Sequence, residues 1–157
     1  MAEVVQSVLD THRDEAAFRG VSLSTVVEAN EVGHWDPQMV DQMVSNLVSN
    51  AIRYGVGSPV EVRAGRHAPG VAFFRVTDAG PGIPESERMR MFQKFERVVA
   101  SSGHRSGFGL GLWIVARLAA AHQGSVEVQT PAGGGCAFTI KLPLQPAPTQ
   151  SPGGPFE

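Results

Sequence analysis

A glycine-rich stretch in the C-terminal half constrains this chain more than any other feature. Glycines alternate with apolar residues in Gly107-Phe108-Gly109-Leu110-Gly111-Leu112, and an apolar helical pattern from Trp113 to His122 follows directly. Alternating glycines allow positive φ and let a ligand approach the backbone closely. The new helix adds unpaired N–H groups and the positive end of its dipole. The combination predicts a phosphate site, with a glycine-rich turn before a core helix as the alternative interpretation.

Length and composition indicate one globular domain. The chain has 157 residues, which is enough to bury a substantial core. Its net charge is −2 and its 13 Lys and Arg residues are scattered, so no basic patch for nucleic acid can be read from the sequence. The single cysteine, Cys136, excludes an internal disulfide framework and lies in an apolar run. We therefore expect a packed core thiol.

The sequence shows neither a signal peptide nor a segment that could span a membrane. No signal peptide is visible. The most apolar run, Leu110 to Ala121, carries Arg117 and is too short to span a bilayer. We expect a cytoplasmic domain without direct membrane contact, either alone or as the cytoplasmic part of a larger, membrane-anchored protein.

The first third of the chain predicts two helices with a strand between them. A loose apolar stripe predicts a helix over Glu3 to Phe18, and β-branched residues predict a strand over Val21 to Val27. Asp36-Pro37 supplies an N-cap carboxylate and a proline at the first helical position. The helix that starts there runs to about Tyr54, with apolar residues at i, i+3 and i+4 spacing.

A polar stripe follows the flank of this second helix. Asn46, Asn50 and Arg53 lie beside its apolar face. Asparagine costs about 0.5 kcal/mol in a helix interior relative to alanine. Two asparagines one turn apart therefore predict a functional surface, with two half-exposed polar residues as the alternative.

The rest of the chain predicts strands separated by turns, with short helical segments. Arg66 to Gly70 is expected to be the polar turn of a hairpin, and Val98 to Ser106 a mobile loop that could act as a lid. Pro, Gly, Gln and Ser dominate the C-terminus, which predicts a domain over residues 1–144 and a disordered tail over 145–157. The remaining elements are strands at Val60–Ala64, Val71–Thr77, Ser125–Gln129 and Cys136–Leu142, and a short helix at Glu85–Phe92.

The end of the strand over Val71–Thr77 carries a second candidate site. Asp78-Ala79-Gly80-Pro81-Gly82-Ile83-Pro84 closes this strand as a turn-rich loop. A carboxylate at a strand end before two glycines predicts a position that faces a ligand. An ordinary Asp/Gly turn is the alternative.

The order and spacing of these signals resemble the catalytic and ATP-binding domain of sensor histidine kinases, within the gyrase, Hsp90, histidine kinase and MutL superfamily. The resemblance covers roughly Glu3 to Pro143. It implies the Bergerat-type α/β fold, an α+β two-layer sandwich with a mixed sheet of about five strands on about three helices. The stretches that carry it are Asn46-Leu47-Val48-Ser49-Asn50-Ala51-Ile52-Arg53-Tyr54, Asp78 to Pro84, Phe92-Gln93-Lys94-Phe95-Glu96-Arg97, Gly107 to Leu112 and Phe138 to Pro143.

The resemblance also implies a role for each matching residue. Asn50 would bind Mg²⁺ through its side-chain oxygen with the help of Asn46, as suits a hard cation that keeps water and phosphate ligands. Arg53, where the family usually has lysine, would contact phosphate. Tyr54 would pack near the adenine, and Asp78 would accept a hydrogen bond from its amino group.

The remaining implied contacts surround the base, ribose and phosphates. Gly80 and Gly82 would let the base and ribose pass close to the backbone, and Ile83 would be a further contact of the nucleotide. Arg97 would reach the γ-phosphate when the lid closes, a charge-stabilising role in phosphoryl transfer. The phosphates would lie against Gly107, Phe108, Gly109, Leu110, Gly111 and Leu112.

Two departures from the family pattern matter. Phe108 stands where threonine or serine is common, so a hydroxyl contact to phosphate is missing. No histidine lies in the phosphoacceptor context of a dimerisation segment. The resemblance therefore implies a domain that donates the γ-phosphoryl group to a histidine on a separate dimerisation segment, acts upstream of a response regulator, and does not autophosphorylate alone.

Two other functions remain open. Stand-alone ATPases and serine kinases of the superfamily place glutamate at the position of Asn46, where it serves as a general base. The asparagine here favours the histidine kinase. A non-catalytic regulatory module that binds nucleotide, or nothing, is favoured only by Phe108.

Overall fold

The computed structural model describes residues 1–55, 57–88, 90–92 and 111–145. The predicted lid, the glycine stretch up to Leu110 and the predicted tail from Pro146 onward lie outside these residues. The elements in chain order are α1 (Ala2–Phe18), β1 (Leu23–Val27), α2 (Pro37–Tyr54), β2 (Val60–Ala68), β3 (Val71–Asp78), α3 (Glu85–Arg88), the 3₁₀ turn η1 (Arg90–Phe92), α4 (Gly111–Ala121), β4 (Ser125–Gln129) and β5 (Cys136–Pro143).

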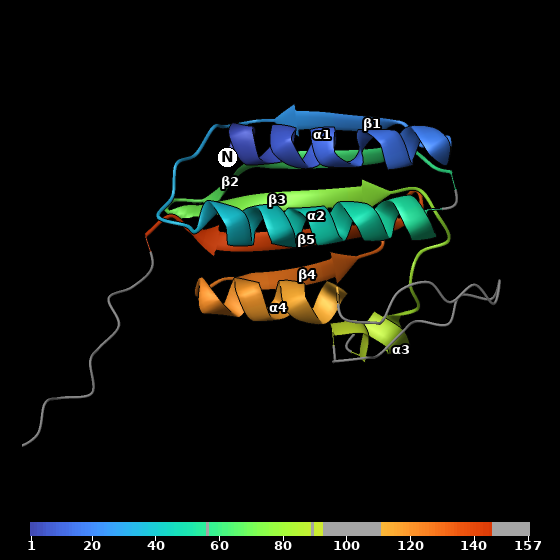
Figure 1. Ribbon diagram of the computed structural model, residues 1–157. Coiled ribbons are helices and arrows are strands. Elements are labelled where there is room, and N and C mark those ends of the chain that lie inside the picture. The colour runs from blue at the N-terminus through green and yellow to red at the C-terminus, as the bar shows by residue number, and fades with distance from the viewer. Residues whose placement is uncertain (56, 89, 93–110, 146–157) are drawn as a thin grey trace, which may run out of the picture.

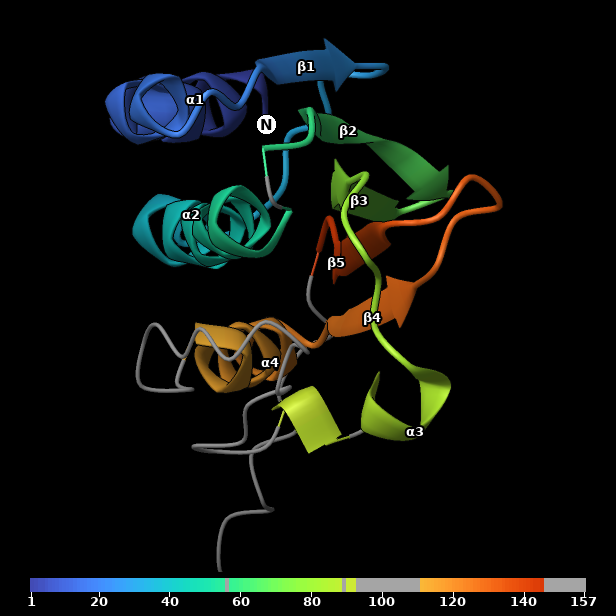
Figure 2. The same ribbon diagram turned by 90° about the vertical axis from the view of Figure 1, so that its right-hand side faces the viewer.

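The strands form one mixed sheet of five strands in the order β1-β2-β3-β5-β4. β1 runs parallel to β2, and every other neighbouring pair is antiparallel. Helices α1, α2 and α4 lie side by side on one face of the sheet, as Figure 2 shows. The predicted two-layer α/β sandwich is confirmed.

Helix α2 lies between α1 and α4 and supplies the centre of the core (Figures 1 and 2). Its apolar face is at most 5% exposed and packs against the buried side chains of the sheet, including Phe74, Ile140 and Leu142. The i, i+3, i+4 spacing read from the sequence therefore matches the buried face. Its members are Val40, Met43, Val44, Leu47, Val48, Ala51 and Ile52.

The start of α2 is set by local chemistry. The Asp36 carboxylate accepts hydrogen bonds from the backbone N–H groups of Gln38 (2.9 Å) and Met39 (3.4 Å). Pro37 occupies the first turn, where its missing N–H costs nothing. Cap and proline together begin the helix where the sequence predicts.

Three predicted boundaries are wrong. β1 begins at Leu23, because the N–H of Val21 donates to the carbonyl of Ala16 and closes the end of α1. β2 continues through an irregularity to Ala68, so the predicted turn from Arg66 is shorter. The predicted helix over 85–92 is divided into α3 and η1.

Among the described residues, no helix is both long and apolar enough to cross a membrane.

Candidate nucleotide-binding site

One edge of the molecule gathers the ends of elements that are far apart in sequence. The C-terminal end of α2, the end of β3 and the start of α4 meet there, and the C-terminal end of α1 lies beside them (Figure 1). The edge therefore combines Asn50, Asp78 and Gly111, which the sequence places in three separate motifs, and Asn46 lies one turn before Asn50 on α2.

Asp78 ends β3 with a buried carboxylate. It is 8% exposed, and its Oδ1 accepts a hydrogen bond of 2.8 Å from the backbone N–H of Gly80. Burial raises the pKa of the Asp78 carboxyl, and the Gly80 hydrogen bond partly offsets this rise. None of the described residues forms an ion pair with Asp78, and an unpaired buried carboxylate is costly, so this position suits a group that receives a donor from a ligand.

The loop after Asp78 needs glycine at Gly80. A Cβ atom there would lie 2.9 Å from the Cα of Gly55 and 3.1 Å from the carbonyl oxygen of Tyr54. The backbone N–H of Ala79 donates to Ser58 Oγ at 3.1 Å, which ties the loop to the segment after α2. Because the backbone of Gly80 lies so close to that of Tyr54 and Gly55, there is no room for a side chain at position 80.

The next part of the loop rests on the β4–β5 turn. Gly82 has a φ of +77°, and a Cβ atom on it would lie 2.9 Å from the carbonyl oxygen of Gly135. Ile83 is partly buried against the core. These contacts fix the loop after β3 against the β4–β5 turn and the core. Gly82 and Ile83, which are predicted to contact the nucleotide, therefore lie close to the end of β3.

The two asparagines of α2 differ in their surroundings. Asn46 Nδ2 is buried and has no hydrogen-bond partner among the described residues. Asn50 Nδ2 lies 4.0 Å from the position that a Cβ atom would take on Gly111, the first residue of α4. The Asn50 side chain therefore lies close to the first residue of α4, the helix that follows the glycine stretch. This proximity agrees with the prediction that both motifs contact one ligand.

Arg53 and Tyr54 lie at the end of α2 with exposed side chains. The Arg53 side chain is 36% exposed, and its Nε is 3.8 Å from Oε1 of Glu15 on α1. Tyr54 is 39% exposed. Both residues lie at the same end of α2 as Asn50. Arg53, which is predicted to contact phosphate, contacts the carboxylate of Glu15 in this structure.

The remaining predicted site residues divide into two groups. Leu112 packs partly buried against the core, while Gly111 begins α4. Arg97, Gly107, Phe108, Gly109 and Leu110 lie outside the described residues, so their predicted roles stay predictions.

Two residues beside the site were not singled out as functional from the sequence. Cys136 starts β5 directly opposite Asp78, and burial, with a smaller contribution from the Asp78 charge, raises the pKa of its thiol to about 12. Arg88 donates to Thr130 Oγ1 at 2.7 Å, and its buried Nε has no partner among the described residues. The sequence contains no periodicity or motif that points to either residue. Their positions beside the site depend on strand pairing and on loop packing.

The residues present fit a nucleotide held with Mg²⁺. Among the described residues, no group of three or more His, Cys, Asp or Glu could hold a metal ion. Mg²⁺ in nucleotide sites takes one or two protein oxygens together with phosphate and water. The buried Asn46 Nδ2 lacks a partner among the described residues and is a donor that a phosphate oxygen would satisfy, while the Asn50 side-chain oxygen is of the type that Mg²⁺ takes.

Comparisons with known proteins agree with this arrangement. Residues 35–146 match the family model of histidine kinase-, DNA gyrase B- and HSP90-like ATPases. The signal transduction histidine-protein kinase AfsQ2 of Streptomyces coelicolor is 40% identical over 123 residues, which are 78% of this chain and 23% of AfsQ2. The chain thus spans about a quarter of the length of that relative.

Solved structures give the same result. The mycobacterial sensor histidine kinase MprB superposes with a TM-score of 0.76 at 31% identity, covering 93% of this chain and 95% of the MprB chain. Full-length ShkA in complex with AMPPNP gives a TM-score of 0.79 at 28% identity, over 92% of this chain and 30% of ShkA. The chain therefore belongs to the histidine kinase-, DNA gyrase B- and HSP90-like ATPase family, as an ATP-binding catalytic domain of the two-component kinase type.

Proposed function

We propose that this domain binds Mg²⁺-ATP and donates the γ-phosphoryl group to a histidine on a separate dimerisation segment. The observation that carries the proposal is the buried Asp78 carboxylate, which has a raised pKa, no cationic partner among the described residues, and a glycine wall beside it. An exocyclic amino group is a donor that such an acceptor selects, and adenine has one where guanine has a carbonyl.

The polar flank of α2 would hold the phosphate end. Asn50, assisted by Asn46, supplies amide oxygens to Mg²⁺, which when bound neutralises phosphate charge. Arg53 lies at the same end of the helix and provides a positive charge for phosphate. Gly111 begins α4 there, so the positive end of this helix's dipole adds to the phosphate end of the site.

Two of the described histidines, His12 and His122, make hydrogen bonds within the helical layer. His12 Nε2 is 2.5 Å from Ser45 Oγ. His122 Nδ1 donates to the carbonyl of Leu118, and its Nε2 accepts from the backbone N–H of Asp36 at 3.4 Å. Phosphoryl transfer needs the acceptor in line with the leaving group. We infer that the acceptor and the base arrive with a partner segment, and that a response regulator in the cytoplasm receives the phosphoryl group afterwards.

The test combines binding with transfer. Calorimetry should show ATP binding that strengthens with Mg²⁺, and incubation of the purified chain with γ-labelled ATP should give negligible self-labelling. Addition of the cognate dimerisation segment should restore labelling on that segment. Asp78→Asn in the same assay should abolish it, which assigns the transfer to this site.

Three outcomes would contradict the proposal. Acid-labile self-labelling of the isolated chain that is lost with one histidine would place the acceptor within it. Steady ATP hydrolysis without a partner would favour a stand-alone ATPase. Absence of nucleotide binding would favour a non-catalytic module.

A further inference from the structure

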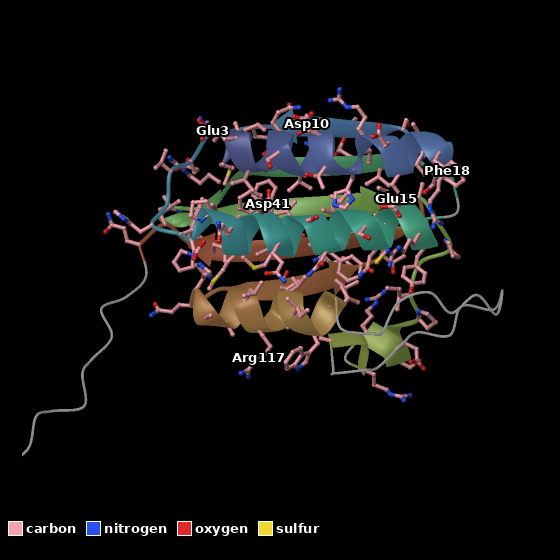
Figure 3. All side chains as sticks on the ribbon, in the orientation of Figure 1. Glu3, Asp10, Glu15, Phe18, Asp41 and Arg117 are labelled. Carbon is pink, nitrogen blue, oxygen red and sulfur yellow. The ribbon has the colours of Figure 1, made fainter. Side chains whose placement is uncertain are left out.

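Glu15 of α1 lies among three cationic or titratable side chains, which come from α1, from the residue that follows it and from α2. Its Oε1 is 3.8 Å from Arg53 Nε on α2 and 3.7 Å from Arg19 Nε, and its Oε2 is 3.7 Å from His12 Nδ1. Figure 3 shows Glu15 on the second half of α1, at the same edge as the nucleotide site, whereas Glu3 lies at the other end of the helix. The carboxylate therefore contacts a predicted phosphate ligand from outside the known motifs.

The contact between Glu15 and Arg53 is electrostatic and easily exchanged. At 3.8 Å it is longer than a hydrogen bond. Both side chains are about one-third exposed, at 32% for Glu15 and 36% for Arg53. Solvent screens such a pair, so the interaction between the two side chains is weak. A bound polyphosphate carries several negative charges and can outcompete one carboxylate for the guanidinium.

We propose that Glu15 is a positioning residue that competes with the phosphates of the nucleotide for Arg53 and so weakens ATP binding. This inference rests on the proposed function. The competition arises because Arg53 lies in the last turn of α2, where it contacts Glu15 of α1, while Asn50 of the predicted phosphate end lies one turn earlier on the same helix. Arg53 must leave Glu15 to reach a phosphate, and the cost of that exchange lowers the affinity.

The physical consequence is selective for charged ligands. Removing the Glu15 carboxylate should strengthen binding of ATP and leave binding of adenosine unchanged, because adenosine has no phosphate for Arg53 to contact. The gain should be about twofold to fivefold, the range of a screened surface pair. It should also shrink at high salt, since screening weakens both the pair and its competitor.

The experiment measures ATP and adenosine affinities by calorimetry for Glu15→Gln, Arg53→Gln and the double variant. Asp14→Asn is the matched control, because it removes one exposed carboxylate from the next position of the same helix and changes net charge equally. Arg19→Gln tests the other arginine that contacts Glu15. Thermal unfolding of every variant reports whether the fold is retained.

We expect Glu15→Gln alone to tighten ATP binding and to leave adenosine binding unchanged. In combination with Arg53→Gln, it should change ATP affinity no more than Asp14→Asn does. An unchanged or weakened ATP affinity in Glu15→Gln would overturn the inference. A gain that persists in Arg53→Gln would also overturn it, and loss of that gain in Arg19→Gln would assign it to Arg19. Failure of the proposed function is distinguishable from all of these, because it would appear in the wild-type chain itself, as self-labelling, hydrolysis without a partner, or absence of ATP binding.

Discussion

Asp78 and Cys136 are direct cross-strand neighbours, the last residue of β3 opposite the first residue of β5. Both are buried, at 8% and 4% exposed, and the Asp78 charge contributes to the raised pKa of the thiol. A carboxylate and a neutral thiol therefore lie next to each other at the end of β3, where the sequence predicts the contact with the adenine.

Asp78→Asn should abolish most ATP binding and leave the fold intact. The amide can still accept from the Gly80 N–H, but it presents a poorer acceptor to the adenine amino group. A mismatched buried polar group costs on the order of 1–3 kcal/mol. Calorimetry with ATP, together with circular dichroism, checks both parts, and wild-type affinity in the variant would remove Asp78 from the site.

The same variant should reveal a pH dependence of stability. Burial raises the pKa of Asp78 in the folded state, so the native protein binds this proton more tightly than the unfolded chain. This contribution to the free energy of unfolding is complete below the ordinary aspartate value and is lost as pH rises through the raised pKa. The asparagine variant cannot ionise.

The stability of Asp78→Asn relative to the wild type should therefore increase with pH across that window and level off above it. Urea denaturation of both proteins, between about pH 4 and pH 8, measures the difference. A difference that is constant over the whole range would contradict the raised pKa.

Gly80→Ala should damage the site through packing alone. The new Cβ would meet the Gly55 backbone at 2.9 Å, and overpacking of this kind costs about 1–3 kcal/mol. Gly133→Ala is the matched control, because nothing lies within 4 Å of a Cβ there and its φ is not positive. We expect reduced ATP affinity and melting temperature for the first variant only, and equal effects in the two would refute the close approach.

Asn50→Ala should weaken ATP binding more in the presence of Mg²⁺ than in its absence. The change removes an amide oxygen at the phosphate end and no contact at the base end. We expect about a tenfold loss with Mg²⁺, which corresponds to about 1.4 kcal/mol. Parallel titrations with Mg²⁺ and with EDTA distinguish the two, and equal losses would rule out a metal-binding role.

Cys136 should be inert in the folded protein. Alkylation requires the thiolate, and burial raises the pKa of this thiol to about 12. Iodoacetamide at about pH 8 should therefore label the native chain negligibly and the urea-unfolded chain readily, as mass spectrometry can follow because Cys136 is the only cysteine. Rapid native labelling would show that β5 opens at this end.

The sequence by itself determined the local elements and the family. Asp36 and Pro37 begin α2, and the apolar spacing that follows predicts its buried face correctly, because capping and amphipathicity act within a few residues. The sequence predicts a strand boundary less well where the preceding element uses the backbone N–H groups at the start of the strand. Val21 has strand-like chemistry, but its N–H is used to close α1.

Tertiary structure alone decided which side chains meet. The strand order places β5 between β3 and β4, and this order sets Cys136 against Asp78. The packing of α1 on α2 brings Glu15 to Arg53, residues that no motif connects. The physical reason is range: propensities and caps act along the chain within one or two turns, whereas partners such as these depend on how distant segments pack.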